Sequence, residues 1–207
     1  YFRSLLPLNP LAEAHVRMEV ERLTPPNIRA NPKFASLEWR LILPPYLGRF
    51  CPAFTPERDD IGITMQFARG AEVNLNDWSV QTTLCNVRTL SSTLVGVSGE
   101  IGQWVGERLP DGDEQVLARS LTANGSAVYD YKTRQELTYV LRAPEDLLSF
   151  AVSLVPFLQH SDPVRALMGA KLLKEALPLR DPEIPLIATG LESDVLEAAP
   201  MFRAMLR

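Results

Sequence analysis

The chain is organised around the stretch Ser153–Pro178, SLVPFLQHSDPVRALMGAKLLKEALP. An apolar segment leads through a short polar elbow into an amphipathic helix. Asp162 is placed to cap that helix, and Pro163 takes the first helical position, where its missing N–H costs nothing. Large apolar residues recur near one face of the helix: Val164, Met168, Leu172 and Leu173. Arg165 lies in the first turn, where a guanidinium beside free backbone N–H groups can hold an anion such as a phosphate.

The composition is that of an ordinary soluble protein, with 207 residues, 46% hydrophobic and 22% charged. This length allows one large domain or two small ones. The net charge of −4 gives no general basic signature for nucleic acid, so such a contact needs a local patch or a neighbouring subunit. Cys51 and Cys85 fit neither a disulfide framework nor a metal site, which favours a reduced, cytoplasmic protein. No apolar run approaches the ~20 residues of a membrane helix. The chain begins without Met, and we expect it to be a piece of something longer.

Several familiar kinds of site are missing from the sequence. His15 and His160 lie far apart, with no cysteine or carboxylate at metal-ligand spacing. There is no phosphate-binding glycine loop, no dinucleotide fingerprint and no serine elbow. Glu57, Asp59 and Asp60 form a small acidic cluster that is open to Mg²⁺ in principle. A solvated turn, or an ion pair with Arg49 or Arg58, is the favoured interpretation of that cluster.

Three separated motifs carry a resemblance to a known family. The string SLVPFLQHSDPVRALMGA, continued by ALPL and PLIATGLE, closely resembles a segment of the β subunit of multisubunit RNA polymerases, and its core RALMGA is identical. The stretch 46–63, YLGRFCPAFTPERDDIGI, is a second strong match, with Gly48, Arg49, Thr55 and Gly62 among the retained residues. NPLAE at 9–13 resembles the entry to the family's fork-loop region. The resemblance covers about residues 1–70 and 137–192.

The departures from the family are polar and local. Phe54 stands where the family has a glutamate, and Val164 where it has an asparagine. Of the family's basic run after NPLAE, only Arg17 is kept. The proline-rich loop TPPNIRANP replaces a glycine-rich one, and its Arg29 matches the fork arginine. The segment before NPLAE is shorter than in the family, which removes most of the loop that helps to form the rifampicin pocket.

The resemblance implies DNA-templated RNA synthesis by two-metal phosphoryl transfer. It implies that Arg165 reaches the triphosphate of the incoming nucleotide. Residues implied to lie near the nucleic acid are Arg17, Arg29, Glu57 and Asp60. Mg²⁺ is implied to be held by another subunit, with no metal and no catalytic residue in this chain. The implied partners are β′-like and α-like subunits, DNA, RNA and nucleoside triphosphates, with no membrane. The family's two active-site lysines have no match here, so the isolated chain is predicted to be inactive.

The expected fold class is α+β, with a discontinuous mixed core and an inserted β-rich domain. The core is predicted to comprise residues 1–72 and 142–192, and the insertion residues 73–141, with a C-terminal helix at 193–207. Helices are expected within 1–23, over 61–71 and from 142, and a strand over 37–43. Strands are also expected at 79–87, 93–105 and 137–141, and a hairpin at 116–131 around Asn124-Gly125. Trp78, Trp104, Tyr129 and Tyr131 suggest a base-stacking surface, but packing within the insertion is favoured.

Two hypotheses of different classes remain open. The first is a fragment of a divergent catalytic β subunit, active when assembled. The second is a degenerate, non-catalytic β-like scaffold or partner-binding module. The loss of polar contacts, as at Phe54, favours the second, whereas the survival of Arg165 and Glu57 favours the first. We prefer the first.

Overall fold

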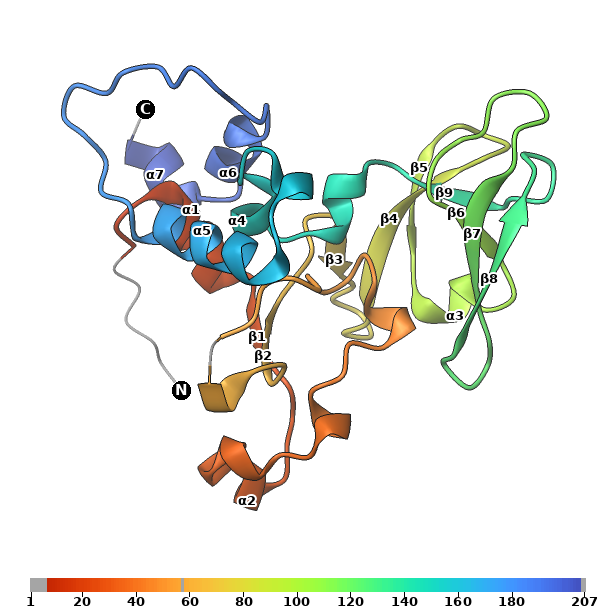
Figure 1. Ribbon diagram of the computed structural model, residues 1–207, viewed down its shortest axis with the longest axis horizontal. Coiled ribbons are helices and arrows are strands. Elements are labelled where there is room, and N and C mark those ends of the chain that lie inside the picture. The colour runs from red at the N-terminus through yellow and green to blue at the C-terminus, as the bar shows by residue number, and fades with distance from the viewer. Residues whose placement is uncertain (1–6, 57, 206–207) are drawn as a thin grey trace. The chain divides into compact units, whose positions relative to one another are not determined.

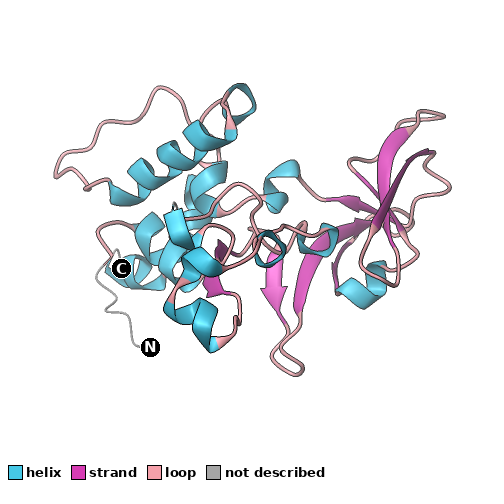
Figure 2. Cartoon of the chain, turned by 60° about the horizontal axis from the view of Figure 1, so that its bottom comes forward, coloured by secondary structure: helices cyan, strands magenta, loops and turns pink. Residues whose placement is uncertain are grey.

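The computed structural model describes residues 7–56 and 58–205, and it divides into two compact units. Unit 1 is built from the described parts of residues 1–40, 53–67 and 149–207, and unit 2 from residues 41–52 and 68–148. Helices dominate unit 1 and strands dominate unit 2, as Figure 2 shows. The α+β class expected from the sequence is confirmed. No described helix is both long enough and apolar enough to cross a membrane.

Unit 1 consists of short helices, most of which contact its first helix, and a two-stranded antiparallel sheet (Figure 1). Its helices are α1 (Pro10–Arg17), α2 (Pro26–Ala30), α4 (Phe150–Ser153), α5 (Pro163–Glu175), α6 (Glu192–Glu197) and α7 (Pro200–Met205). Turns of 3₁₀ helix lie at Pro32–Phe34, Leu37–Trp39, Arg58–Asp60 and Leu158–His160. Strand β1 (Glu19–Glu21) pairs with β2 (Thr64–Gln66), with Val20 opposite Met65. Helix α1 begins as the sequence predicts, because Asn9 Oδ1 accepts the N–H of Ala12 and Pro10 follows it.

Four local predictions for unit 1 are wrong. The helix expected over 61–71 is a turn followed by the buried strand β2, because Gly62 takes a left-handed φ of 71° and the next residues pair with β1. The strand expected over 37–43 is a 3₁₀ turn that runs towards the prolines at 44 and 45. The loop expected over 24–32 contains α2, which starts at a proline. The C-terminal helix is interrupted before Pro200, whose missing N–H suits a helix start but not a helix interior; its last two residues lie outside the described part.

Unit 2 is a seven-stranded mixed sheet that confirms the strands predicted at 79–87 and 137–141 and the hairpin at 116–131. The strand expected over 93–105 is wrong, because a short helix at Val97–Glu100 divides this range into two separate strands. Its strands are β3 (Ala71–Val73), β4 (Val80–Asn86), β5 (Ser92–Val95), β6 (Trp104–Gly106), β7 (Val116–Leu121), β8 (Ala127–Lys132) and β9 (Tyr139–Leu141). They run in the order β3-β4-β9-β6-β7-β8, with β5 also paired to β4. Only the β6–β9 pair is parallel among the described pairs. Gly125 takes the positive φ of 81° that the β7–β8 turn requires.

Two apolar clusters form the core of unit 2. One gathers Val87, Val116, Ala118, Leu137 and Val140, and the other Leu84, Val95 and Val105. Short helical turns flank the sheet at α3 (Val97–Glu100), Pro44–Tyr46 and Pro144–Leu147. The turn at Pro144–Leu147 lies where the sequence predicts that a helix restarts, and α4 follows it.

A buried charge network joins the segment 41–52 to the sheet of unit 2. The guanidinium of Arg49 donates to the carboxylate of Glu100 at 2.6 Å and to the carbonyl oxygens of Val80 and Val95 at 2.9 Å. Arg119 reaches the second oxygen of the same carboxylate at 2.9 Å. Of the alternatives for the acidic cluster, an ion pair between Arg49 and Asp59 or Asp60 is therefore not formed, and both of these aspartates are exposed, as in a solvated turn. A retained residue of the second motif instead fastens segment 41–52 to unit 2, although the motif's second half lies in unit 1.

Candidate functional site

The N-terminus of α5 has the capped geometry that the sequence predicts. Phe157 turns the chain before the helix with a left-handed φ of 55°. Asp162 Oδ1 then accepts the N–H of Val164 at 2.8 Å and that of Arg165 at 3.3 Å. Pro163 occupies the first helical position. The cap and the first turn are thus confirmed.

Arg165 is exposed in this first turn. Its Nη1 contacts the Met168 sulfur at 3.6 Å, and it forms no ion pair with any residue that the structure describes. One expectation is corrected: the backbone N–H groups beside Arg165 are not free. The carboxylate of Asp162 takes two of them and its carbonyl oxygen takes that of Ala166 at 3.0 Å. Anion binding here therefore depends on the guanidinium of Arg165 rather than on the helix N–H groups.

The side of α5 that faces the rest of unit 1 carries mainly small residues, together with Leu167. Ala166, Leu167 and Ala170 are buried. A Cβ at Gly169 would lie 3.6 Å from a methyl of Val155, so the helix approaches the end of α4 closely. The larger apolar residues marked in the sequence are exposed. The RALMGA motif therefore provides a small-residue face that fixes the direction of Arg165.

Arg17 lies at the end of α1 and is engaged in an ion pair. Its guanidinium binds Glu13 at 3.0 Å, and Glu13 is fully buried. The Glu13 carboxylate also accepts the N–H of Met201 at 3.0 Å and of Phe202 at 3.3 Å, in the first turn of α7. Burial alone would raise the pKa of Glu13, but these donors together outweigh it and lower the pKa. Arg17 thus neutralises a buried carboxylate that organises α7.

Arg29 and Asp60 come together at one pocket of unit 1, although 31 residues separate them. The pocket has a volume of about 140 Å³ and is lined by residues of both signs, including Glu21 and Arg22. Arg29 belongs to α2, and Asp60 ends the 3₁₀ turn at Arg58–Asp60. The structure therefore groups two of the residues that the resemblance places near nucleic acid.

Arg40 positions the loop that carries Asp60, and no pattern in the sequence pointed to it. Its guanidinium donates to the carbonyl oxygens of Pro32, Asp59 and Ile61 at 2.7, 2.8 and 2.7 Å. Gly62 packs directly against this residue, since a Cβ there would lie 2.5 Å from the carbonyl oxygen of Arg40. A surface arginine that binds only carbonyl groups leaves no charge pattern in the sequence that would reveal it.

The remaining acidic residue of that motif, Glu57, lies outside the described residues. Among the residues that are described, no group of three or more His, Cys, Asp or Glu side chains is placed to hold a metal ion.

The aromatic residues of unit 2 do not pack as expected. Trp78, Tyr129 and Tyr131 are exposed. Only Trp104 is half-buried, with the ammonium of Lys132 lying 4.8 Å from the centre of its ring. Lys132 is itself paired with Asp130 at 2.8 Å. The predicted packing is therefore wrong for three of the four. Tyr129 and Tyr131 lie on β8, an edge strand with one open side, and Trp78 lies in the turn between β3 and β4.

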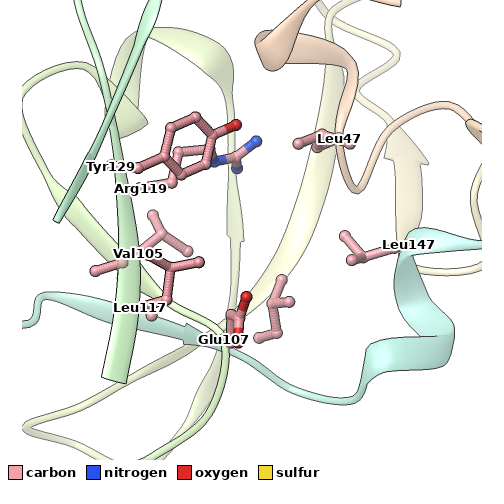
Figure 3. Close-up of a pocket in the computed structure, with 10 residues that line it drawn as sticks. Leu47, Val105, Glu107, Leu117, Arg119, Tyr129 and Leu147 are labelled. Carbon is pink, nitrogen blue, oxygen red and sulfur yellow. The ribbon is translucent and has the colours of Figure 1, made fainter. Parts of the chain in front are cut away.

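Unit 2 has a mainly apolar pocket of about 120 Å³ (Figure 3). Leu47 and Leu147 line one side of it, and Val105, Leu117 and Tyr129 lie opposite. Arg119 lies at this pocket, but its guanidinium is already bound to the Glu100 carboxylate and to the carbonyl oxygen of Pro44. Burial lowers the pKa of Arg119, and the nearby Glu100 carboxylate opposes this. The pocket thus offers mainly apolar contact, with the carboxylate of Glu107 also in its lining.

Comparison with known proteins supports the motifs. No protein-family model matches the chain. Curated proteins similar to it include the DNA-directed RNA polymerase subunit beta of Prochlorococcus marinus (strain MIT 9303), 33% identical over 205 residues. That of Synechococcus sp. (strain CC9311) is 32% identical over 202 residues. Each alignment covers 93% of the chain but only 18% of the relative's length. The chain is therefore a divergent relative of one region of the DNA-directed RNA polymerase β subunit, as its three motifs indicated.

Proposed function

We propose that the chain is part of a β-like subunit of a multisubunit RNA polymerase and that Arg165 helps to hold the triphosphate of the incoming nucleotide. The observation that carries this proposal is the geometry of Arg165. It stands exposed in the capped first turn of α5, without an ion pair to a described residue, inside a motif identical to that of the family. A guanidinium binds phosphate oxygens in a bidentate manner and stays charged at any physiological pH.

The chain's own contribution is to bind and orient, in an assembly that we place in the cytoplasm. Two Mg²⁺ ions, held by another subunit, would neutralise the charge that develops as the phosphoryl group is transferred. Arg165 would fix the position of the triphosphate relative to those ions. The pocket that contains Arg29 and Asp60 would face the template DNA or the RNA. The isolated chain has no means of catalysis, and its partners are β′-like and α-like subunits.

The test is nucleotide addition by the assembled polymerase carrying Arg165→Ala. A charge-assisted hydrogen bond contributes about 1.5–3 kcal/mol, so we expect nucleotide addition to weaken by roughly ten- to a hundredfold in kcat/KM. Arg165→Lys should recover part of the loss, because a point charge remains without the bidentate geometry. The matched control is Arg134→Ala, which removes an exposed arginine between β8 and β9 and should leave addition unchanged.

One observation favours the alternative of a non-catalytic scaffold. Phe54, which replaces a glutamate of the family, is buried and packs edge-on against His15 with ring centroids 4.7 Å apart. A polar position has thus become part of the core. If assemblies with Arg165→Ala formed normally and added nucleotides as fast as the unchanged assembly, the scaffold function would replace the proposed one.

A further inference from the structure

The outward face of α5 carries an apolar stripe that no described residue of unit 1 covers. Val164, Met168 and Leu172 follow one another at intervals of four residues and therefore lie on one side of the helix. All three are exposed, and Leu172 is 69% exposed. The opposite side of α5, with Ala166 and Ala170, is the one that packs within the unit. The stripe is thus available to something other than the described part of unit 1.

The connector after α5 continues this apolar surface. Residues 176–191 join α5 to α6 as the long blue loop in Figure 1. Leu177 and Leu179 are exposed, Ile184 is 92% exposed and Leu186 is fully exposed. Leu177 and Leu179 are two residues apart, and so are Ile184 and Leu186. This spacing places both side chains of a pair on one side of an extended segment. We call the α5 stripe together with these four side chains the docking strip.

The connector's backbone also lacks partners within the described chain. No hydrogen bond to the N–H or C=O groups of residues 177–188 is present among the described residues. Exposed apolar side chains in two consecutive segments, next to backbone groups without a partner among the described residues, are typical of segments that another polypeptide covers. A bilayer interior would satisfy the side chains but not the backbone groups.

The charges of the connector argue against a nucleic-acid occupant. Arg180 is its one cation between 177 and 188, whereas Asp181 and Glu183 are both acidic. A phosphate backbone would be repelled by this balance. Polypeptide supplies both the apolar side chains and the hydrogen-bonding groups that the strip lacks.

We propose that the docking strip is covered by polypeptide of the same β-like protein, outside these 207 residues. The relatives are more than five times as long as the region that the chain matches, since it covers 18% of them. In a protein of that kind the remaining polypeptide is tethered beside the strip, which gives it a high effective concentration there. The inference rests on the proposed function only in naming the covering chain as β-like.

The test compares thiol reactivity in the chain alone and in the assembled polymerase. Ile184→Cys places a thiol in the strip, and Arg134→Cys places one in an exposed turn of unit 2 as the matched control. Both should react with maleimide at similar rates in the chain alone. In the assembly, the Ile184→Cys thiol should react at least ~tenfold more slowly than the control, because the centre of an interface excludes water.

A photocrosslinker attached through Ile184→Cys then identifies the occupant. We expect crosslinks to residues of the β-like protein outside this region. Equal reactivity of the two thiols in the assembly would overturn the proposal, as would crosslinks to a second copy, another subunit or nucleic acid. Protection needs assembly but not nucleotide addition, so assemblies with Arg165→Ala should show the same protection. A failure of the proposed function and a failure of this inference are therefore distinguishable.

Leu172→Asp gives an independent measurement on the α5 part of the strip. Because Leu172 is exposed, the melting temperature of the chain alone should hardly change. Its incorporation into the assembly should fall by roughly tenfold or more, since an unpaired carboxylate would be buried in the interface. The control Glu175→Gln, also exposed on α5, should assemble normally. Normal assembly of Leu172→Asp would show that the stripe is not covered.

Discussion

The side-chain amide of Asn9 donates to the carbonyl oxygen of Ala176 at 2.6 Å and thereby joins the start of α1 to the end of α5. The same Nδ2 group lies 3.2 Å from the carbonyl oxygen of Leu173 and 3.0 Å from that of Lys174. Meanwhile its Oδ1 accepts the N–H of Ala12 at 2.8 Å. Helix ends leave N–H and C=O groups without partners, and here one side chain serves both kinds. The NPLAE and RALMGA motifs therefore depend on each other physically.

Asn9→Ala should destabilise unit 1 by about 1–3 kcal/mol, because it removes an N-cap and leaves carbonyl groups at the end of α5 without a donor. Urea unfolding followed by circular dichroism measures the loss. Asn9→Asp keeps the acceptor for Ala12 but places a carboxylate beside carbonyl oxygens, so it should be no more stable than Asn9→Ala. The control Asn27→Ala changes an exposed asparagine of α2 and should shift unfolding by less than about 0.5 kcal/mol. Equal effects of Asn9→Ala and Asn27→Ala would show that the double cap is not important.

Local signals in the sequence correctly predicted the start of one helix and the position of one hairpin. Asp162-Pro163 predicted the start of α5, and Asn124-Gly125 predicted the β7–β8 hairpin, because each signal acts within a few residues. The resemblance singled out Arg165, which is exposed in the first turn of α5, and its role at the nucleotide stays a prediction.

What the sequence did not predict depends on contacts between distant residues. Asn9 could be seen as a cap for α1, but nothing local indicates that its amide also reaches α5, 167 residues away at Ala176. Likewise, the sequence around Arg49 does not indicate its ion-pair partner, because Glu100 lies 51 residues away in a glycine-rich segment. The helix wrongly expected over 61–71 fails for the same reason, since pairing with β1 decides its structure.

Gly62→Ala should destabilise unit 1 strongly, because the new Cβ would lie 2.5 Å from the carbonyl oxygen of Arg40. A left-handed φ alone costs an alanine about 1–2 kcal/mol, and this contact adds to it. Gly190→Ala is the matched control, since Gly190 has a φ of 82° in the same unit and its Cβ would meet nothing within 4 Å. Urea unfolding should therefore show a clearly larger loss for Gly62→Ala. Similar losses would mean that the contact with Arg40 relaxes freely.

Glu13 should make unit 1 sensitive to acid. Its pKa in the folded chain lies below the ordinary value of 4.5: burial opposes ionisation, but the N–H groups of Met201 and Phe202 and the Arg17 guanidinium outweigh it. The unfolded chain therefore binds this proton more readily than the folded one. The stabilisation is complete above the unfolded pKa and is lost as the pH falls through the lower folded pKa.

Glu13→Gln removes the titrating carboxyl group and therefore tests whether Glu13 makes the chain less stable at low pH. The variant should melt at a lower temperature than the unchanged chain at pH 7, because the amide oxygen accepts more weakly from the two N–H groups and leaves Arg17 without its anion. Its further loss of melting temperature between pH 7 and pH 3 should be smaller than that of the unchanged chain. An equal acid-induced loss in both proteins would show that Glu13 does not carry the effect.

Replacing Glu100 should destabilise unit 2 more than replacing its other carboxylates, because Glu100 lies between Arg49 and Arg119 and all three side chains are buried. Glu100→Gln leaves two buried cations without a counter-charge, and breaking a buried ion pair in this way costs about 3–5 kcal/mol. Urea unfolding followed by the fluorescence of Trp78 and Trp104, which both belong to unit 2, measures the loss.

Glu114→Gln provides the control within the same unit. Glu114 pairs with Arg108 at the surface, where both side chains are largely solvated, so its replacement should barely move the unfolding midpoint. If Glu100→Gln fails to fold, the triple replacement Arg49→Met, Glu100→Leu and Arg119→Met should restore part of the structure. Removing all three charges together leaves none of them buried and unpaired, although the carbonyl oxygens of Val80 and Val95 lose their donor. Equal midpoints for Glu100→Gln and Glu114→Gln would instead show that the network does not fasten segment 41–52 to the sheet.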